Sequence, residues 1–405
     1  MDCNLSQKMS RRSFTKAAIS LGVSATSLYY GTQEGLAQQA STDQVPYVKF
    51  LRGMPKPYGE GRRPVYDSIP REEWERRYTA IDVRQRVARW ISQKYRQSGI
   101  TAEFVPDESS PTDFGVRVVN TVTKERKEVS TSQLRSEFEG KWTGEAGPKG
   151  SKVTRQGIPV VVKERYEAQT GCSENHDGLT KKNLDEIPGG VDIDVPDAGA
   201  EGSLTAPFYN KGGYGVGWIV AGHVVNINNN NGDSGYDVLQ GEDGIEDKIG
   251  KARYGNNAID ADWAYIENTE SGTSAISRVA DEENIVYRDY PIGGIATNDT
   301  LKNKVGTDET FFIQGLASGR VSGTILGTGG GLNGPSYVGT SHDNTTGDSG
   351  GILFGTGPND YYAYVAGTVY AQTGSDDDGD GCRDDTKSTT AETVEDRGNG
   401  YFMSV

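Results

Sequence analysis

A serine set among glycines is the first residue of the chain that could do chemistry. Ser349 lies in "TTGDSGGILF", residues 345–354, and Ser234 lies in a second GDSG copy at residues 232–235. A serine hydroxyl attacks a carbonyl carbon when a base removes its proton, a carboxylate orients that base, and backbone N–H groups stabilise the oxyanion. The sequence must therefore also supply a histidine and an acid.

The base has three candidates, because the chain contains only three histidines. His176 lies in a loop with Asn and Asp, and His342 lies in a polar loop shortly before Ser349. His223 ends the apolar strand predicted at 216–221, in "WIVAGHVV". We take His223 as the candidate base; a histidine that merely ends a strand is the structural alternative.

The acid is sought in "AIDADWAYIE", where Asp260 and Asp262 are two residues apart and share one face of a predicted strand. Asp262 is the better candidate because it directly precedes the apolar run 263–266, which enters the core. The candidates then follow one another in the order His223, Asp262, Ser349.

The elements that must position these residues are short strands. From residue 186 onward, apolar or alternating runs separated by Gly, Asn and Asp recur about every ten residues, which predicts an all-β sandwich or barrel. These runs include 213–225, 260–267, 304–307 and 350–355. A short helix is expected at 391–397.

The region before residue 186 has a different composition and pattern. Residues 41–66 are rich in Pro, Gly and Arg and are interpreted as an extended lead-in. A helix is predicted to begin at Ser68 as N-cap, with Pro70 in its first turn, and to end at Gly99. Strands at 114–122 and 157–167 and a helical piece at 132–138 complete a small α+β region, 41–185, without a catalytic cluster.

Three motifs carry a family resemblance: Gly-His after an apolar strand, Asp-Trp-Ala-Tyr-Ile, and Gly-Asp-Ser-Gly-Gly. Together and in this order they resemble the signatures of the chymotrypsin-like serine proteases. The resemblance covers about residues 186–400 and implies an all-β, double β-barrel protease domain. It implies Ser349 as nucleophile, His223 as base and then acid, Asp262 as orienting carboxylate, and the N–H groups of Gly347 and Ser349 as oxyanion hole.

The same resemblance separates the two GDSG copies, because Ser234 precedes both aspartates and has no place in the barrel order. An esterase nucleophile elbow, G-x-S-x-G, is excluded by chain order, since those enzymes run Ser, Asp, His. A surface turn therefore explains Ser234.

Substrate recognition is implied less directly. Asp343 corresponds to the acid at the base of the specificity pocket in trypsin-like relatives, although a solvated loop acid is equally compatible with the sequence. The segment with Thr368 and Tyr370 resembles the strand that pairs with an extended substrate, but Tyr370 is bulkier than the usual residue. Asp348 pairs with a freed N-terminus in relatives activated by cutting, and its partner here is left open.

The start of the chain has the layout of an export signal. Paired Arg11 and Arg12, then Phe14, Lys16 and a short apolar stretch, predict a twin-arginine signal over residues 1–40 and a secreted protein. No apolar run is long enough to span a membrane.

Charge divides the chain near residue 170. The overall net charge is -15, which splits into about +8 before that point and about -23 after it. The acidic part disfavours nucleic-acid binding and suits a halophilic source. The basic region before it is either a propeptide that docks by charge or a permanent accessory domain, and the charges favour the propeptide.

Two further features have structural alternatives. Cys172 and Cys382 form a disulfide or remain free thiols once Cys3 leaves with the signal. The alternating acids at 376–380 are a calcium loop or a solvated acidic loop, and Lys387 occupies the position where an EF-hand needs Glu.

The sequence thus predicts a secreted serine endopeptidase of residues 186–405 that acts on peptides without metal or organic cofactor. A non-catalytic binding or scaffold protein that keeps the barrels is the alternative. A β-rich surface protein with an accidental GDSGG is the second.

Overall fold

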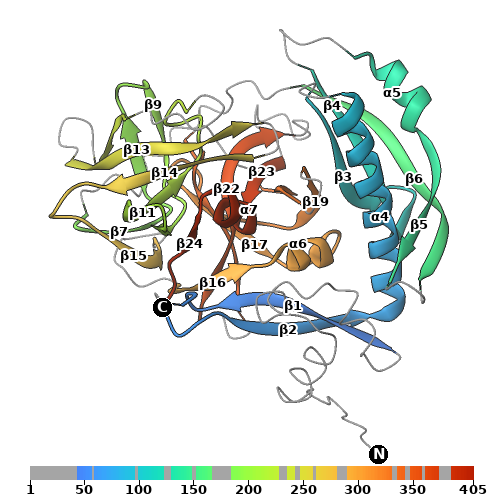
Figure 1. Ribbon diagram of the computed structural model, residues 1–405, viewed down its shortest axis with the longest axis horizontal. Coiled ribbons are helices and arrows are strands. Elements are labelled where there is room, and N and C mark those ends of the chain that lie inside the picture. Colours follow the sequence, from blue (N-terminus) through green and yellow to red (C-terminus); the bar gives the residue numbers. More distant parts are fainter. Residues whose placement is uncertain are drawn as a thin grey trace, which may run out of the picture.

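Strands dominate the part of the chain that the computed structural model describes. It comprises residues 43–56, 59–95, 99–122, 129–147, 152–166, 184–227, 235–241, 247–258, 261–280, 290–330, 335–342, 347–357, 361–373 and 385–405. Figure 1 shows one barrel in green and yellow, a second in orange and red, and an α+β region in blue and teal beside it. The predicted fold class is confirmed. In the described ranges, no helix is long and apolar enough to cross a membrane.

The first barrel closes because one stretch of chain pairs with two different neighbours. Its strands are β8 (Asp192–Val195), β9 (Ala200–Ser203), β10 (Pro207–Asn210), β11 (Gly215–Val220), β12 (Asp237–Gln240), β13 (Asp247–Ala258), β14 (Ala261–Asn268) and β24 (Gly400–Phe402). Their order is β24-β10-β11-β14-β13-β12-β8-β9. Since β9 pairs with β8 and the consecutive β10 pairs with β11, the segment 200–210 joins both ends of the sheet. Next to it, β7 (Glu186–Gly189) and β15 (Ser274–Val279) form a parallel pair.

The second barrel closes in the same way. Its strands are β17 (Phe311–Gly315), β18 (Gly319–Gly323), β19 (Ile325–Gly329), β20 (Tyr337–Thr340), β21 (Ile352–Thr356), β22 (Ala363–Thr373) and β23 (Asp385–Thr390). The order is β18-β17-β21-β22-β23-β20-β19, so it begins and ends with two strands separated by Thr324 alone. β16 (Ile292–Ala296) and the helices α6 (Asn298–Lys304) and α7 (Ala391–Arg397) pack around this barrel.

Alternating side chains on the strands fill two cores at once. On β14, Ala264 and Ile266 lie in the core of the first barrel, whereas Trp263 and Tyr265 lie in the cluster shared by the two barrels. The sequence of a strand with both faces buried is a continuous run of apolar residues, not an alternation of apolar and polar residues. This double burial holds β14, and with it Asp262, rigidly between the barrels.

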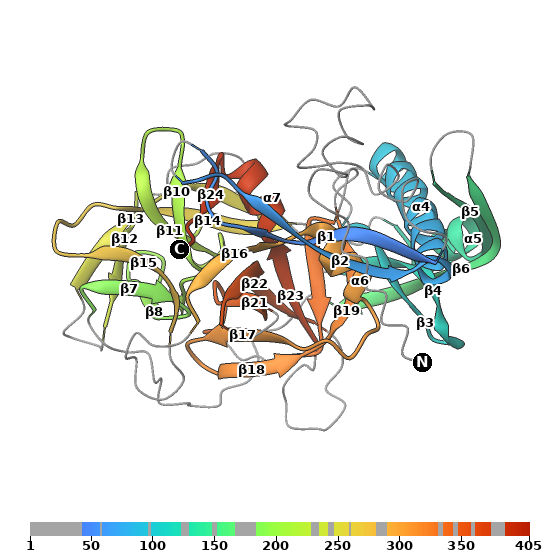
Figure 2. The same cartoon turned by 90° about the horizontal axis from the view of Figure 1, so that it is seen from below.

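The N-terminal region extends the sheet of the second barrel. Its elements are β1 (Gln44–Arg52), β2 (Arg63–Pro70), α4 (Arg71–Lys94), β3 (Ile100–Asp107), β4 (Ser110–Val122), α5 (Thr131–Phe138), β5 (Gly140–Ala146) and β6 (Val153–Tyr166). β3 pairs with β19, and β1 pairs with β16. In Figure 2, which views the molecule from below, the blue hairpin β1–β2 crosses in front of the second barrel toward α4.

Helix α4 and the second barrel also share one hydrophobic core. Val83 and Val87 of the helix belong to the same buried cluster as Ile313 and Leu353 of the barrel. Arg77 on α4 donates to the backbone carbonyls of Lys302 and Val305 at 3.2 and 2.8 Å. The predicted α+β region is therefore joined to the barrel by a continuous sheet and a continuous core.

Three local predictions differ from the structure. Residues 41–66 are not a simple lead-in, because β1 and the first half of β2 form there. Ser68 is not an N-cap: it pairs with Pro46 inside β2, and α4 begins at Arg71 without a side-chain cap. Residues 304–307 do not form a strand, since α6 ends at Lys304; its N-cap Thr297 accepts from the Thr300 N–H.

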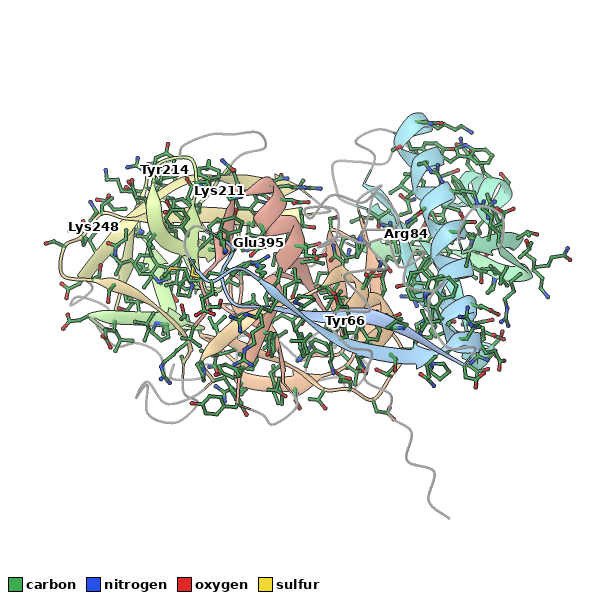
Figure 3. All side chains as sticks on the ribbon, turned by 60° about the horizontal axis from the view of Figure 1, so that its bottom comes forward. Tyr66, Arg84, Lys211, Tyr214, Lys248 and Glu395 are labelled. Atoms are coloured by element: carbon green, nitrogen blue, oxygen red, sulfur yellow. The ribbon has the colours of Figure 1, made fainter. Side chains whose placement is uncertain are left out.

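A buried ion pair ties the hairpin to the end of the chain. Arg62, between β1 and β2, donates through both terminal nitrogens to Glu395 on α7, with an Nη1–Oε2 distance of 2.5 Å. The two residues are 7% and 9% exposed. Glu395 also accepts from the Phe402 N–H at 2.9 Å. Figure 3 labels Glu395 on α7, close to the turn of the hairpin.

We expect Glu395→Gln to lower the free energy of unfolding by about 3–5 kcal/mol, because it removes the negative charge that pairs with the buried Arg62 guanidinium. The double variant Arg62→Met with Glu395→Leu removes both charges and should lose less stability than the single variant. Thermal and urea unfolding followed by circular dichroism measures both. Equal stability of Glu395→Gln and the parent would contradict this account.

Candidate active site

His223 lies in a turn that follows β11. The residue before it, Gly222, has no room for a side chain. A Cβ on Gly222 would lie 2.6 Å from the Asn256 carbonyl oxygen and 2.8 Å from Asp262 Oδ1. The turn is closed by the Asn226 N–H, which donates to the His223 carbonyl at 3.1 Å. This geometry leaves the His223 side chain 39% exposed while its backbone is fixed at the barrel rim.

Asp262 at the start of β14 holds the imidazole. Its Oδ2 lies 2.6 Å from His223 Nδ1, and its Oδ1 accepts from the N–H groups of Gly222 and His223 at 2.5 and 3.2 Å. A carboxylate only accepts, so Nδ1 carries the hydrogen and Nε2 has the free lone pair. The neutral ring is thereby set to take a proton at Nε2.

The second barrel holds the backbone of Asp262 in place. Thr389 on β23 accepts from the Asp262 N–H at 2.8 Å, and its hydroxyl donates to the Asp262 carbonyl at 2.9 Å. Asp262 is 4% exposed and Thr389 is fully buried. Asp262 therefore has little freedom to leave the imidazole.

The electrostatics of His223 follow from this pairing. Partial burial lowers its pKa, but the hydrogen bond and the negative charge of Asp262 outweigh that effect, so the pKa of His223 is raised above 6.5. A raised folded-state pKa means that the pair stabilises the fold fully below the unfolded-state pKa. That stabilisation is lost as the pH rises through the folded-state pKa.

Ser349 lies in a turn, Gly347–Gly351, that we call the serine turn. Gly347 and Gly350 have φ angles of +107° and +93°, which side chains rarely adopt. Within the turn, the Gly351 N–H donates to the Asp348 carbonyl at 2.8 Å. The Gly350 N–H donates to Val369 on β22 at 2.7 Å. The turn is thus rigidly built at the entrance to β21.

Strand β9 of the first barrel holds the serine turn of the second. The Ser203 N–H donates to the Ser349 carbonyl at 2.8 Å, and the Ser203 hydroxyl donates to the Gly347 carbonyl at 2.9 Å. A Cβ on Gly202 would lie 2.7 Å from the Ser349 carbonyl oxygen and 2.9 Å from the Val224 side chain. One glycine therefore separates Ser349 from the residue after His223.

The N–H groups of Gly347 and Ser349 have no acceptor within the described part of the chain. Because the carbonyls of both residues are engaged by Ser203, the peptide planes of the turn are oriented by the first barrel. Such backbone donors are the groups that stabilise a developing oxyanion.

Two of the residues predicted for substrate binding, Thr368 and Tyr370, lie in the described part of the chain. Thr368 is fully buried, its hydroxyl accepts from Thr205 at 3.0 Å, and its backbone pairs with Ile352 on one side and Thr389 on the other. Tyr370 is 9% exposed and packs in the first-barrel core. Asp343, Asp260, Ser234, His176, both cysteines 172 and 382, and residues 376–380 lie outside the described residues.

His342, which the sequence placed in a polar loop, is fully buried. Its Nε2 lies 3.0 Å from the Phe311 carbonyl oxygen, and burial lowers its pKa to about 4. It is a neutral structural histidine at the base of β17. Sequence reasoning missed Ser203 and Thr389, because a single Ser or Thr in a strand carries no local signal.

Nuclear magnetic resonance titration of the imidazoles should give His223 a pKa above 6.5 and His342 a pKa about 4. Asp262→Asn should lower the pKa of His223, since the negative charge is lost while the partial burial remains. The pKa of His342 should stay unchanged and serves as the internal control. A wild-type His223 pKa at or below 6.5 would contradict the proposed pairing.

No protein-family model matches the chain, and no curated protein is significantly similar to it in sequence. Solved structures match at low identity. Chymotrypsin from Cellulomonas bogoriensis is 16% identical, with 54% of this chain and 100% of that chain covered and a TM-score of 0.38. A glutamic acid specific serine protease, described as using a histidine triad in substrate binding, is 18% identical, with 53% and 100% covered and a TM-score of 0.39. Each of these matches covers about half of this chain.

Proposed function

We propose that the protein is a secreted serine endopeptidase that hydrolyses peptide bonds through an acyl-enzyme. The observation that carries this proposal is the His223–Asp262 pair: a buried carboxylate, whose backbone Thr389 holds, lies 2.6 Å from Nδ1 of a partly exposed imidazole. Strand β9 holds the glycine-bounded serine turn, and a Cβ on Gly202 of that strand would meet both Ser349 and Val224, the residue after His223. A histidine that merely ended a strand would not need this second-barrel bracing.

The proposed reaction runs in two halves. His223 Nε2 takes the Ser349 hydroxyl proton while Oγ bonds to the scissile carbonyl carbon, and the carbonyl electrons move to an oxyanion that the Gly347 and Ser349 N–H groups stabilise. Nε2–H then protonates the leaving amine as the C–N bond breaks. Water repeats the sequence, giving its proton to Nε2 and releasing the acid. Asp262 stays ionised and holds the imidazolium throughout.

The substrate class is a protein or peptide in an extended form. Because Thr368 is buried and paired on both sides, the pairing edge for such a peptide lies beyond it on β22, after the bulge between Val369 and Ala371. Secretion through the predicted twin-arginine signal and the absence of cofactors complete the proposal. A non-catalytic relative that binds proteins is the alternative.

Ser349→Ala should abolish labelling by a fluorophosphonate probe and lower kcat on a casein-derived peptide pool by about 10⁴-fold or more, because the nucleophile is lost. Gel fluorescence and peptide mass spectrometry measure the two effects. A matched Ser322→Ala variant on the exposed face of β18 should keep both activities. Failure of the wild type to label or cleave would favour the non-catalytic alternative.

The pH profile offers a separate test. Protonated His223 cannot accept the serine proton, so kcat/KM should fall as the pH drops through the raised pKa of His223. The midpoint should lie above 6.5 and should match the value from the imidazole titration. A profile that is flat between pH 5 and 8 would exclude His223 as the base.

A further inference from the structure

We infer that the loop Gly315–Ser318, which we call the clamp loop, holds the serine turn in its working shape without any cut in the chain. This inference rests on the proposed function. It assigns Ser318 as a positioning residue that acts through Asp348, the residue beside the nucleophile.

Asp348 is a fully buried acid whose carboxylate accepts hydrogen bonds from the clamp loop. Its Oδ1 accepts from the N–H groups of Ala317 and Ser318 at 2.9 and 3.0 Å, and its Oδ2 accepts from the Ser318 hydroxyl. A buried carboxylate is tolerated only where donors replace its water, and charge-assisted hydrogen bonds are the strong ones. One short segment of the same chain provides three such donors.

The clamp loop and the serine turn pack closely against each other. A Cβ on Gly315 would lie 2.4 Å from Asp348 Oδ1, so the approach of the carboxylate requires glycine there. A Cβ on Gly347 would lie 3.3 Å from the Ala317 side chain and 3.5 Å from the Leu316 side chain. The clamp loop and the serine turn are thus in contact along their length.

Ser203 connects both segments to the first barrel. Its hydroxyl accepts from the Leu316 N–H at 2.8 Å and donates to the Gly347 carbonyl at 2.9 Å. Asp348 anchors the turn on one side and Ser203 anchors it on the other. The direction of the Gly347 and Ser349 N–H groups is therefore fixed between two anchors, both present in the continuous chain.

The hydrogen bonds to Asp348 bear on whether the protein must be cut to become active. A turn whose buried acid needed a newly created amino terminus would form only after proteolysis. Here backbone N–H groups and a hydroxyl of residues 317 and 318 fill that role. The acylation site is therefore formed in the uncut polypeptide, and removal of the N-terminal region is not what builds it.

The first experiment treats the full chain with a small fluorophosphonate probe and measures intact masses over time. The adduct should appear on the full-length mass before any shortened species is detected. An adduct on shortened chains alone would overturn this inference and leave the endopeptidase proposal standing. An adduct on no species would overturn the proposed function and this inference with it.

The second experiment compares Ser318→Ala, Ser318→Thr and the control Ser322→Ala. Loss of one donor to Asp348 should loosen the oxyanion donors, so Ser318→Ala should lower kcat about 10-fold, less than direct removal of an oxyanion donor, with KM unchanged. Ser318→Thr keeps the hydroxyl and should restore most of kcat. Equal kcat in Ser318→Ala and the wild type, or a loss that Ser318→Thr does not reverse, would overturn the assignment.

Discussion

The hydrogen bonds of Ser203 to the serine turn are the interaction on which the site depends. The candidate base and its carboxylate belong to the first barrel, whereas the candidate nucleophile belongs to the second. Apolar contact between two packed barrels is not directional, but a proton transfer between them tolerates little misplacement. Ser203 resolves this conflict, because its N–H and hydroxyl engage the backbone on both sides of Asp348. Thr389 makes the reciprocal connection, from the second barrel to Asp262.

Sequence reasoning found His223, Asp262 and Ser349 because each lies next to a local signal. His223 follows an apolar run that is buried on both faces, and Asp262 precedes another. Ser349 lies among glycines that the backbone geometry requires. Ser203 and Ser318 gave no such signal, since their importance comes only from what folds against them. The surroundings of Thr368 were hidden for a related reason: the segment matched a family pattern, but the strands that pair with it on both sides are set by tertiary contacts.

The helix boundary and the N-terminal region show the same limit. Ser68, a good N-cap residue two positions before a proline, was drawn into β2 by its partner strand, so pairing overrode local preference. Arg77, Arg84 and Glu103 would be ordinary surface charges in an isolated α+β domain. Here they are buried, with exposures of 2%, 4% and 5%, because the region joins the second barrel. Arg84 on α4, labelled in Figure 3, donates to the Ala102 carbonyl at 3.0 Å.

The pairing of β1 with β16 also bears on how the protein reaches this state. Val48, on β1, accepts a hydrogen bond from Thr297, which is 249 residues further along the chain. Contacts of such long sequence separation form late and slow the folding of a chain. During synthesis the first hairpin has no partner strand until most of the polypeptide has left the ribosome, and its strand edges stay open to wrong pairings for that time. We therefore expect the hairpin to reach its final pairing only after β16 has been synthesised.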